Sequence, residues 1–200
     1  MDAADGALLG LLSAEVLERD GRPKEHCNKR SLDEKESRRW VTATCQAEDL
    51  LAAGAAAVTM VEDREADFYE AFACRPERVD GVARVHHNRN LVDGTKLYDA
   101  CQTRPELGRI QLDLPATPKR KARRATLAVR ARVVTIKRPK RNRAQAAAAL
   151  PASLSLTLVE ACEIDPPANV KEVVHWRLLS THSATTLAEA VTIIGYYRCR

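Results

Sequence analysis

Apolar residues recur every three or four positions between residues 40 and 51, which predicts one helix from about Leu32 to Ala53. The Ser-Leu-Asp-Glu sequence at 31–34 is a capping box, in which a serine oxygen and a glutamate three residues later satisfy free backbone N–H groups. Gly54 suits the end of this helix, because glycine readily adopts the left-handed conformation of a C-terminal cap. The predicted apolar face consists of Trp40, Ala43, Ala47, Leu50 and Leu51.

A second helical pattern occupies Thr186 to Arg200, where Leu187, Ala190, Val191 and Ile194 share one stripe. Helices very often end in a recognisable C-terminal cap. The sequence stops inside this pattern without one. We therefore expect that the chain is a truncated product.

Several shorter apolar runs lie in the first half of the chain. Residues 7–17 follow the turn dipeptide Asp5-Gly6 and fit a helix or a strand equally well. Ala55 to Val61 lies between Gly54 and a charged segment, which favours a buried strand. The other short elements that we expect are a strand at Val82–His87 and helices at Phe68–Ala73 and Leu97–Cys101.

Four carboxylates lie at or just past the end of the strand predicted at 55–61. They are Glu62, Asp63, Glu65 and Asp67. In open α/β sheets, functional sites form at the carboxyl ends of the strands. The segment fits such a site, and it also fits an ordinary polar loop between a strand and a helix.

From Arg109 onward the hydrophobic pattern changes to alternation, which is typical of antiparallel strands with one face exposed to water. Leu127, Val129, Ala131 and Val133 recur at every second position, and the phase slips at Val133-Val134, which predicts a β-bulge. The other alternating runs are 110–114, 154–158 and 173–181.

The net charge of +5 conceals a strong asymmetry along the 200 residues. No Asp or Glu lies between Leu114 and Val159, whereas 12 Lys or Arg residues lie between Lys119 and Arg143. The rest of the chain carries 20 basic and 27 acidic residues, a net charge of −7. Blocks of like charge are usually solvated and often contact a polyanion, so we expect nucleic-acid contact through backbone phosphates. A disordered basic linker is the alternative.

Composition narrows the classes of protein further. No apolar run reaches 18 residues, which argues against a membrane-spanning helix and against a membrane partner. The first residues lack the basic region of a secretory signal. The six cysteines form no Cys-x-x-Cys pair, which argues against a zinc knuckle and a disulfide-stapled secreted domain. His86 and His87 are adjacent and would face opposite sides of a strand, so we expect no shared metal there.

Five segments in chain order resemble the DDE-class transposases of bacterial insertion sequences, in particular the hairpin-forming, cut-and-paste group called the insertion-sequence-four group. The resemblance covers roughly residues 6 to 200. The segments are Leu-Asp-Glu-Lys-Glu-Ser-Arg-Arg-Trp at 32–40, Asp-Arg-Glu-Ala-Asp at 63–67, Arg84 with His-Asn-Arg at 87–89, Trp-Arg-Leu-Leu at 176–179, and Tyr197-x-x-Arg200.

The resemblance implies an α/β fold, a partial RNase H-like fold that lacks its first strands and carries an inserted antiparallel β subdomain. It implies a partial catalytic core at 1–94, the inserted subdomain at 95–182 with the basic stretch 119–143, and the start of the final core helix at 183–200. Family members cleave and transfer DNA strands with two Mg²⁺ ions held by two aspartates and a glutamate. Two such ions can activate the attacking oxygen and stabilise the leaving oxygen.

The resemblance makes Asp63 one catalytic and metal-binding carboxylate. It places Arg84 and Arg89 on the backbone of the transposon end, and Tyr197 and Arg200 near phosphates beside the site. Trp176 would stack on a flipped base, although ordinary core packing explains a tryptophan on a strand equally well. From their place in the basic stretch we add five expected DNA contacts: Lys119, Arg120, Lys121, Arg123 and Arg124.

The other two metal-binding carboxylates of the family have no counterpart in this sequence. We therefore expect a transposase fragment that is inactive alone and has not retained the two Mg²⁺ ions. The alternatives are a DNA-binding remnant without catalysis and an unfolded product of gene decay. The resemblance further implies double-stranded DNA as partner, a homodimer in the intact family, and a cytoplasmic, nucleoid-associated bacterial location.

Overall fold

The computed structural model describes residues 1–16, 36–118, 121–139, 150–168, 170 and 172–200. The capping box predicted at 31–34 and the predicted DNA contacts Lys119 and Arg120 lie outside these residues. The basic residues at positions 140, 141 and 143 do so as well. None of the helices in the described segments is both long and apolar enough to cross a membrane.

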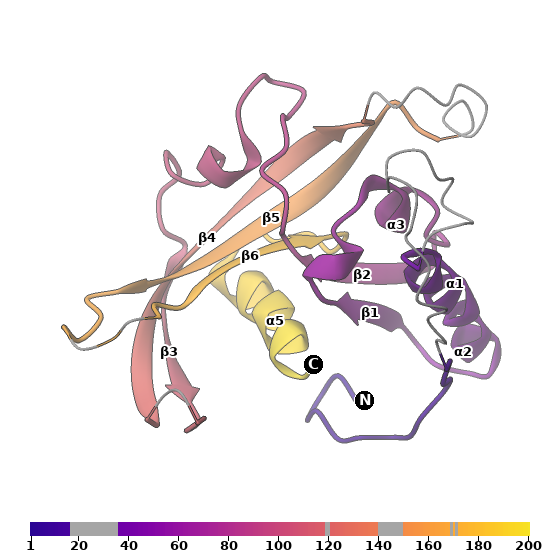
Figure 1. The fold of residues 1–200 in the computed structure, drawn as a ribbon, viewed down its shortest axis with the longest axis horizontal. Coiled ribbons are helices and arrows are strands. Elements are labelled where there is room, and N and C mark those ends of the chain that lie inside the picture. Colours follow the sequence, from indigo (N-terminus) through magenta and orange to yellow (C-terminus); the bar gives the residue numbers. More distant parts are fainter. Residues whose placement is uncertain (17–35, 119–120, 140–149, 169, 171) are drawn as a thin grey trace, which may run out of the picture.

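The fold is mixed α/β. The described strands form one six-stranded mixed sheet, curved into a half-barrel, in the order β1-β2-β6-β5-β4-β3. β1 and β2 are parallel, and all other neighbouring strands are antiparallel. Figure 1 shows β4 and β5 as long strands that extend away from the β1–β2 end. The strands are β1 (Val58–Glu62), β2 (Val79–Arg84), β3 (Gly108–Leu114), β4 (Arg123–Lys137), β5 (Ser153–Ile164) and β6 (His175–Ser180).

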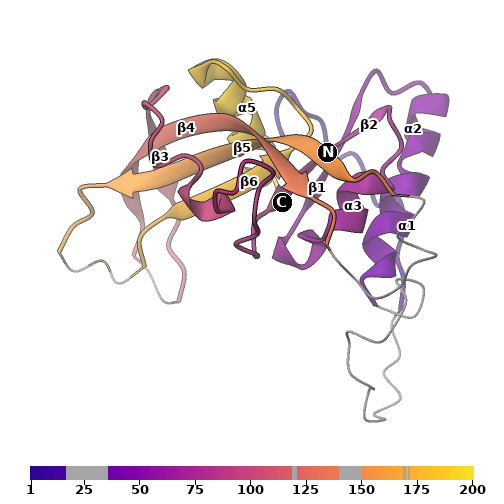
Figure 2. The ribbon, with the colours of Figure 1, turned by 90° about the horizontal axis from the view of Figure 1, so that it is seen from above.

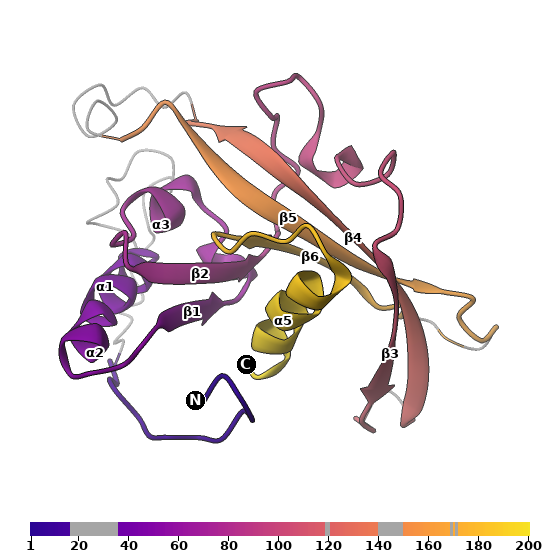
Figure 3. The same ribbon diagram turned by 180° about the vertical axis from the view of Figure 1, so that it is seen from behind.

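Helices cover both faces of this sheet. α5 (Leu187–Arg198) packs on one face, and its C-terminus lies near the N-terminus of the chain (Figure 3). On the other face, α3 (Tyr69–Ala73) packs together with the segment 85–101, which contains the 3₁₀ turn η4 (Leu97–Asp99). α1 (Arg38–Gln46) and α2 (Glu48–Ala52) lie with α3 at the β1–β2 end (Figure 2).

The two faces carry separate hydrophobic cores. Under α5, Leu127 and Val129 of β4 pack with Val159 of β5. On the other face, Val134 and Ile136 of β4 pack beneath α3 and the segment 85–101. β4 therefore contributes odd-numbered residues to the core under α5 along its first half and even-numbered residues to the other core along its second half.

The predicted bulge at Val133-Val134 is wrong. The register between β4 and β5 is unbroken from Thr126 opposite Ile164 to Lys137 opposite Ser153. The change of hydrophobic phase arises because the cover moves from one face to the other, which leaves Val133 61% exposed. The expectation of one wet face is wrong for the same reason: Leu156 to Ala161 of β5 are buried at consecutive positions.

Most of the remaining predicted elements agree with the structure in kind and differ at their ends, but the apolar run after Gly6 does not. The long first helix is present from Arg38, is divided at Ala47, and ends before Gly54, whose φ of +103° is the left-handed conformation expected of a cap. The strand expected at 55–61 begins only at Val58. Residues 7–16 form neither helix nor strand, and the leucines among them are exposed.

Candidate functional site

The predicted site residues Asp63, Arg84, Trp176, Tyr197 and Arg200 come together at one edge of the sheet. β1 and β2 are parallel, so their carboxyl ends meet at this edge. β6 runs antiparallel to β2 and therefore begins there. α5 ends beside it. Four chain segments that are far apart in sequence thus supply one surface.

Asp63 is the first residue after β1 and caps the 3₁₀ turn η3 (Arg64–Ala66). One carboxylate oxygen, Oδ1, accepts a hydrogen bond of 2.7 Å from the backbone N–H of Arg64. The other, Oδ2, pairs with the guanidinium of Arg200 at 2.9 Å. The turn positions the carboxylate at the edge of the sheet, and Arg200 neutralises it.

A chain of contacts leads from this ion pair toward the core, through Arg200, Tyr197 and Trp176. The guanidinium of Arg200 lies 5.1 Å from the centre of the Tyr197 ring, and its NH2 donates to the phenol oxygen at 3.4 Å. Tyr197 is buried, and its ring meets that of Trp176 edge to face at 5.7 Å. Trp176 is half-buried against the core under α5, so the core-packing alternative fits its position.

The protonation of Asp63 follows from these contacts. Partial burial acts to raise the pKa of the carboxyl group, but the Arg64 N–H and the Arg200 guanidinium outweigh burial and leave the pKa below its usual value. Asp63 is therefore ionised at neutral pH and engaged with a cation of the same chain.

The donor set at Asp63 does not fit a two-metal centre. Among the residues that the structure describes, no three His, Cys, Asp or Glu side chains gather closely enough to hold a metal ion. Mg²⁺ sites in proteins use one or two carboxylates together with waters and substrate oxygens. Here both carboxylate oxygens of Asp63 already have protein partners.

The neighbouring carboxylates of the acidic segment have different surroundings. Glu62 is 6% exposed, accepts a hydrogen bond of 3.2 Å from the Thr44 hydroxyl, and has a pKa raised by burial to about 7. Glu65 is exposed and pairs with Arg39 at 2.7 Å. The sequence identified the cluster, but nothing in the hydrophobic pattern distinguished its inward from its outward members.

Asp67, the last of the four, is 1% exposed and organises the loop after β2. Its Oδ2 accepts the backbone N–H groups of His86 at 2.6 Å and His87 at 2.8 Å. Its Oδ1 pairs with the guanidinium of Arg89, which also donates to the Asp67 carbonyl at 2.9 Å. Arg89, an expected DNA contact, is thus engaged inside the protein, with its side chain 17% exposed.

The four arginines of β4 all have carboxylate partners from outside the basic stretch. Arg123 pairs with the buried Glu163. Strand pairing places Asp113 opposite Arg124, and their side chains meet at 2.7 Å. Arg130 and Arg132 pair with Glu106 and Asp93. The sheet therefore neutralises arginine charges that look unbalanced in the sequence. Lys121 is also expected to contact DNA; it lies near the start of β4 and is exposed.

Arg84 lies at the end of β2 and lines a hollow of about 200 Å³. The resemblance names Arg84, but no pattern in the sequence groups Arg64, His86 or His175 with it in one site. These residues are brought together by the parallel pairing of β1 with β2 and the return of β6, a long-range contact for which the sequence carries no local pattern. No protein-family model matches the chain.

Proposed function

We propose that this chain is a DNA-binding protein of the DDE transposase type, with a partial RNase H-like fold and with β3 to β6 as an inserted β subdomain. The observation that carries the proposal is the convergence of Asp63, Trp176, Tyr197 and Arg200. Their contacts join the end of β1, the start of β6 and the end of α5. The resemblance assigns these segments to one site, and their distances are consistent with that.

The DNA surface in this proposal is the edge formed by Asp63, Arg84 and Arg200, with Lys121 as an outlying contact. Arg200 balances Asp63, so Arg84 supplies positive charge there that no described carboxylate neutralises. Arginine forks bind phosphate oxygens in a bidentate manner, which fixes a duplex in place without reading its sequence. The ion pair of Asp63 and Arg200 would have to open before Asp63 could serve a reaction.

We further propose that the described part of the chain binds DNA without cleaving it. The Asp63 carboxylate is held by Arg64 and Arg200, and no cluster of metal ligands surrounds it in the described residues. We therefore assign the two Mg²⁺ ions and the homodimer of the family to an intact relative and not to this chain. A DNA-binding remnant is the form of the hypothesis that this geometry favours.

Fluorescence anisotropy with a labelled duplex at several salt concentrations tests DNA binding. We expect affinity that falls steeply with salt, because each neutralised phosphate contributes a slope of about −0.9 in a log–log plot. Arg84→Gln should weaken binding and reduce that slope by about 1. Arg109→Gln is the matched control, because Arg109 is 61% exposed on β3 and pairs only with a nearby glutamate in the described residues. Salt-independent binding, or an equal effect of both variants, would contradict the proposal.

Incubation of the same duplex with the protein and Mg²⁺ tests the absence of catalysis. We expect intact DNA on a denaturing gel. Strand cleavage by the wild type that disappears in Asp63→Ala would show that the chain assembles a working metal site.

A further inference from the structure

The hollow beside Arg84 is lined mainly by basic side chains from four separate elements. Arg64 comes from η3, Arg84 from the last position of β2, His86 from the loop just after it, Tyr98 from η4, and His175 and Arg177 from the start of β6. Its volume of about 200 Å³ is below the roughly 300–1,000 Å³ of pockets for drug-sized ligands, so the space suits a small group.

The carboxylates around the hollow do not balance its arginines. Glu160 of β5 lies beneath it, 5% exposed, and accepts Arg177 Nε at 3.0 Å and shares a hydrogen bond of 2.9 Å with His175 Nε2. Asp63 is close to Arg64 but forms its ion pair with Arg200. Neither Arg64 nor Arg84 has an ion pair with a carboxylate among the described residues. Three arginines therefore line the hollow, and of these the one buried carboxylate beside it pairs with Arg177 alone, which leaves the hollow positively charged.

The Arg177 guanidinium and the backbone on one side of the hollow are held in place before any ligand arrives. The Arg177 guanidinium lies over the Tyr98 ring at 4.4 Å while Glu160 holds its Nε. The Tyr98 hydroxyl donates to the His86 carbonyl at 2.8 Å, and the Val85 N–H donates to the Arg177 carbonyl at 2.8 Å. Groups whose geometry is already fixed lose little conformational entropy on binding, which favours affinity.

We propose that this hollow binds one tetrahedral oxyanion, a single phosphate group. Arginine is the side chain best suited to phosphate, because its planar fork of donors matches two phosphate oxygens at once. The small volume fits one phosphate and excludes a nucleoside. The inference rests on the charges and contacts of the hollow itself, so it does not require that the chain binds DNA.

Titration of the ¹⁵N-labelled chain with inorganic phosphate at constant ionic strength tests the site. We expect saturable shifts at the backbone amides of Val85 and His86, and little effect from chloride. Arg84→Gln should raise the Kd for phosphate about tenfold, the effect of losing one charge-assisted hydrogen bond. This variant leaves no described carboxylate without its partner, so its fold should survive, and its amide spectrum checks this. Arg109→Gln is the control and should bind phosphate as the wild type does.

Absence of saturable shifts, or an unchanged Kd in Arg84→Gln, would overturn the proposal. A competition experiment distinguishes the sources of the phosphate. If unlabelled duplex DNA displaces phosphate from the hollow, the natural ligand is a backbone phosphate of nucleic acid. If phosphate binds equally well in the presence of saturating duplex, or if the chain binds no DNA at all, the site takes a free phosphate or phosphate monoester and stands apart from the proposed function.

Discussion

Two adjacent carboxylates at the end of β1 illustrate how residue position decides chemistry. Glu62 points toward α1 and is buried, whereas Asp63 lies at the edge of the sheet and meets Arg200. Successive side chains of a strand point to opposite faces, so one step along the chain separates an interior acid from a surface one. The result is a raised pKa for Glu62 and a lowered pKa for Asp63.

The raised pKa of Glu62 predicts a stability that falls with pH. Burial moves the pKa from 4.5 to about 7, so the folded chain holds this proton more tightly than the unfolded chain does. No penalty exists below about pH 4.5; it accumulates between about pH 4.5 and 7 and reaches roughly 3 kcal/mol once the pH has risen past 7. Glu62→Gln should remove most of this loss, measured as the change in the free energy of unfolding between pH 5 and pH 8.

Glu48→Gln provides the control for this prediction, because Glu48 is exposed on α2. It should leave the pH profile of the wild type unchanged. An equal flattening of both profiles would show that the loss of a negative charge, and not the burial of Glu62, is responsible.

Substitution of Asp67 should lower the free energy of unfolding much more than substitution of its exposed neighbour Glu65. Its carboxylate satisfies two backbone N–H groups and the guanidinium of Arg89 in a buried setting. Removing one partner of a buried ion pair typically costs 3–5 kcal/mol, so Asp67→Ala should lower the free energy of unfolding by about that amount. Glu65→Ala, which removes an exposed pair with Arg39, should cost less than about 1 kcal/mol.

Urea denaturation of the two variants checks this difference. Both remove an acid that pairs with an arginine, and both lie within the same short segment, so they differ in burial and in the two backbone N–H groups that only Asp67 accepts. Similar losses in the two variants would contradict the assignment of Asp67 as the organiser of the loop after β2.

At the scale of elements, α5 owes its position to a cap at one end and an apolar face along its length. The Thr186 oxygen accepts the Glu189 N–H, and the Glu189 carboxylate accepts the Thr185 and Thr186 N–H groups. These bonds lower the pKa of Glu189 to about 2. Ala190, Ile193, Ile194 and Tyr197 are buried, whereas Val191, expected in the stripe, is 37% exposed.

Thr186→Ala should destabilise the protein by about 1 kcal/mol, because it leaves a backbone N–H at the start of α5 without its acceptor. Thermal denaturation followed by circular dichroism measures the loss. Thr192→Ala is the control: its hydroxyl only donates to the Ala188 carbonyl within the helix. A loss in the control as large as that in Thr186→Ala would show that the cap does not hold the helix.

Elements with a clear hydrophobic period were predictable from sequence, and their ends and faces were not. The helix that ends before Gly54 and the strands β3 to β6 follow from local spacing. The change of covered face along β4 depends on what packs above it, α5 in one half and the segment 85–101 in the other. A sequence pattern reports burial but does not report which neighbour causes it, so the phase slip was mistaken for a bulge.

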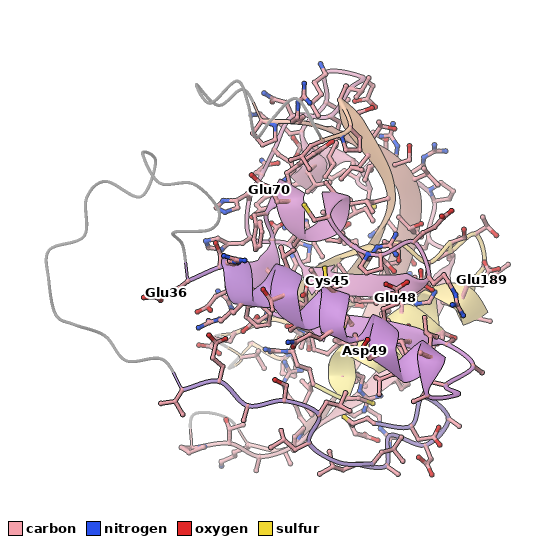
Figure 4. The ribbon with its side chains drawn as sticks, turned by 90° about the vertical axis from the view of Figure 1, so that its right-hand side faces the viewer. Glu36, Cys45, Glu48, Asp49, Glu70 and Glu189 are labelled. Atoms are coloured by element: carbon pink, nitrogen blue, oxygen red, sulfur yellow. The ribbon has the colours of Figure 1, made fainter. Side chains whose placement is uncertain are left out.

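At the scale of the whole molecule, the fold and not the order of residues along the chain decides which charges lie together. Figure 4 shows Glu48 and Asp49 on the outer side of α2, with Glu36 just before the start of α1 and Glu70 on α3 nearby. The arginines of β4 are paired with carboxylates across the sheet. The resemblance made the part of the candidate site at Asp63 and Arg200 predictable. The hollow beside Arg84 could not be predicted, because it is formed by the long-range pairing of β2 with β6.

One sheet joins the first two segments that the resemblance treats as separate domains, and α5 of the third segment packs on it. β2 pairs with β6, and Val82, Leu178 and Ile194 share the core under α5. Strands joined by hydrogen bonds and a common core unfold together, since opening one exposes the apolar surface of the next. We therefore expect one cooperative transition for the described segments.

The two tryptophans of the chain test this cooperativity, because Trp40 lies in α1 and Trp176 in β6. Trp40→Phe leaves Trp176 as the only reporter, and Trp176→Phe leaves Trp40. Each variant shifts stability by its own amount, so its tryptophan fluorescence is compared with its own far-ultraviolet circular dichroism during urea denaturation. The two signals should have coincident midpoints in both variants. A Trp40 signal that changes at lower urea than the circular dichroism would show that α1 and the β1–β2 end unfold as a separate domain, because the antiparallel strands then persist without them.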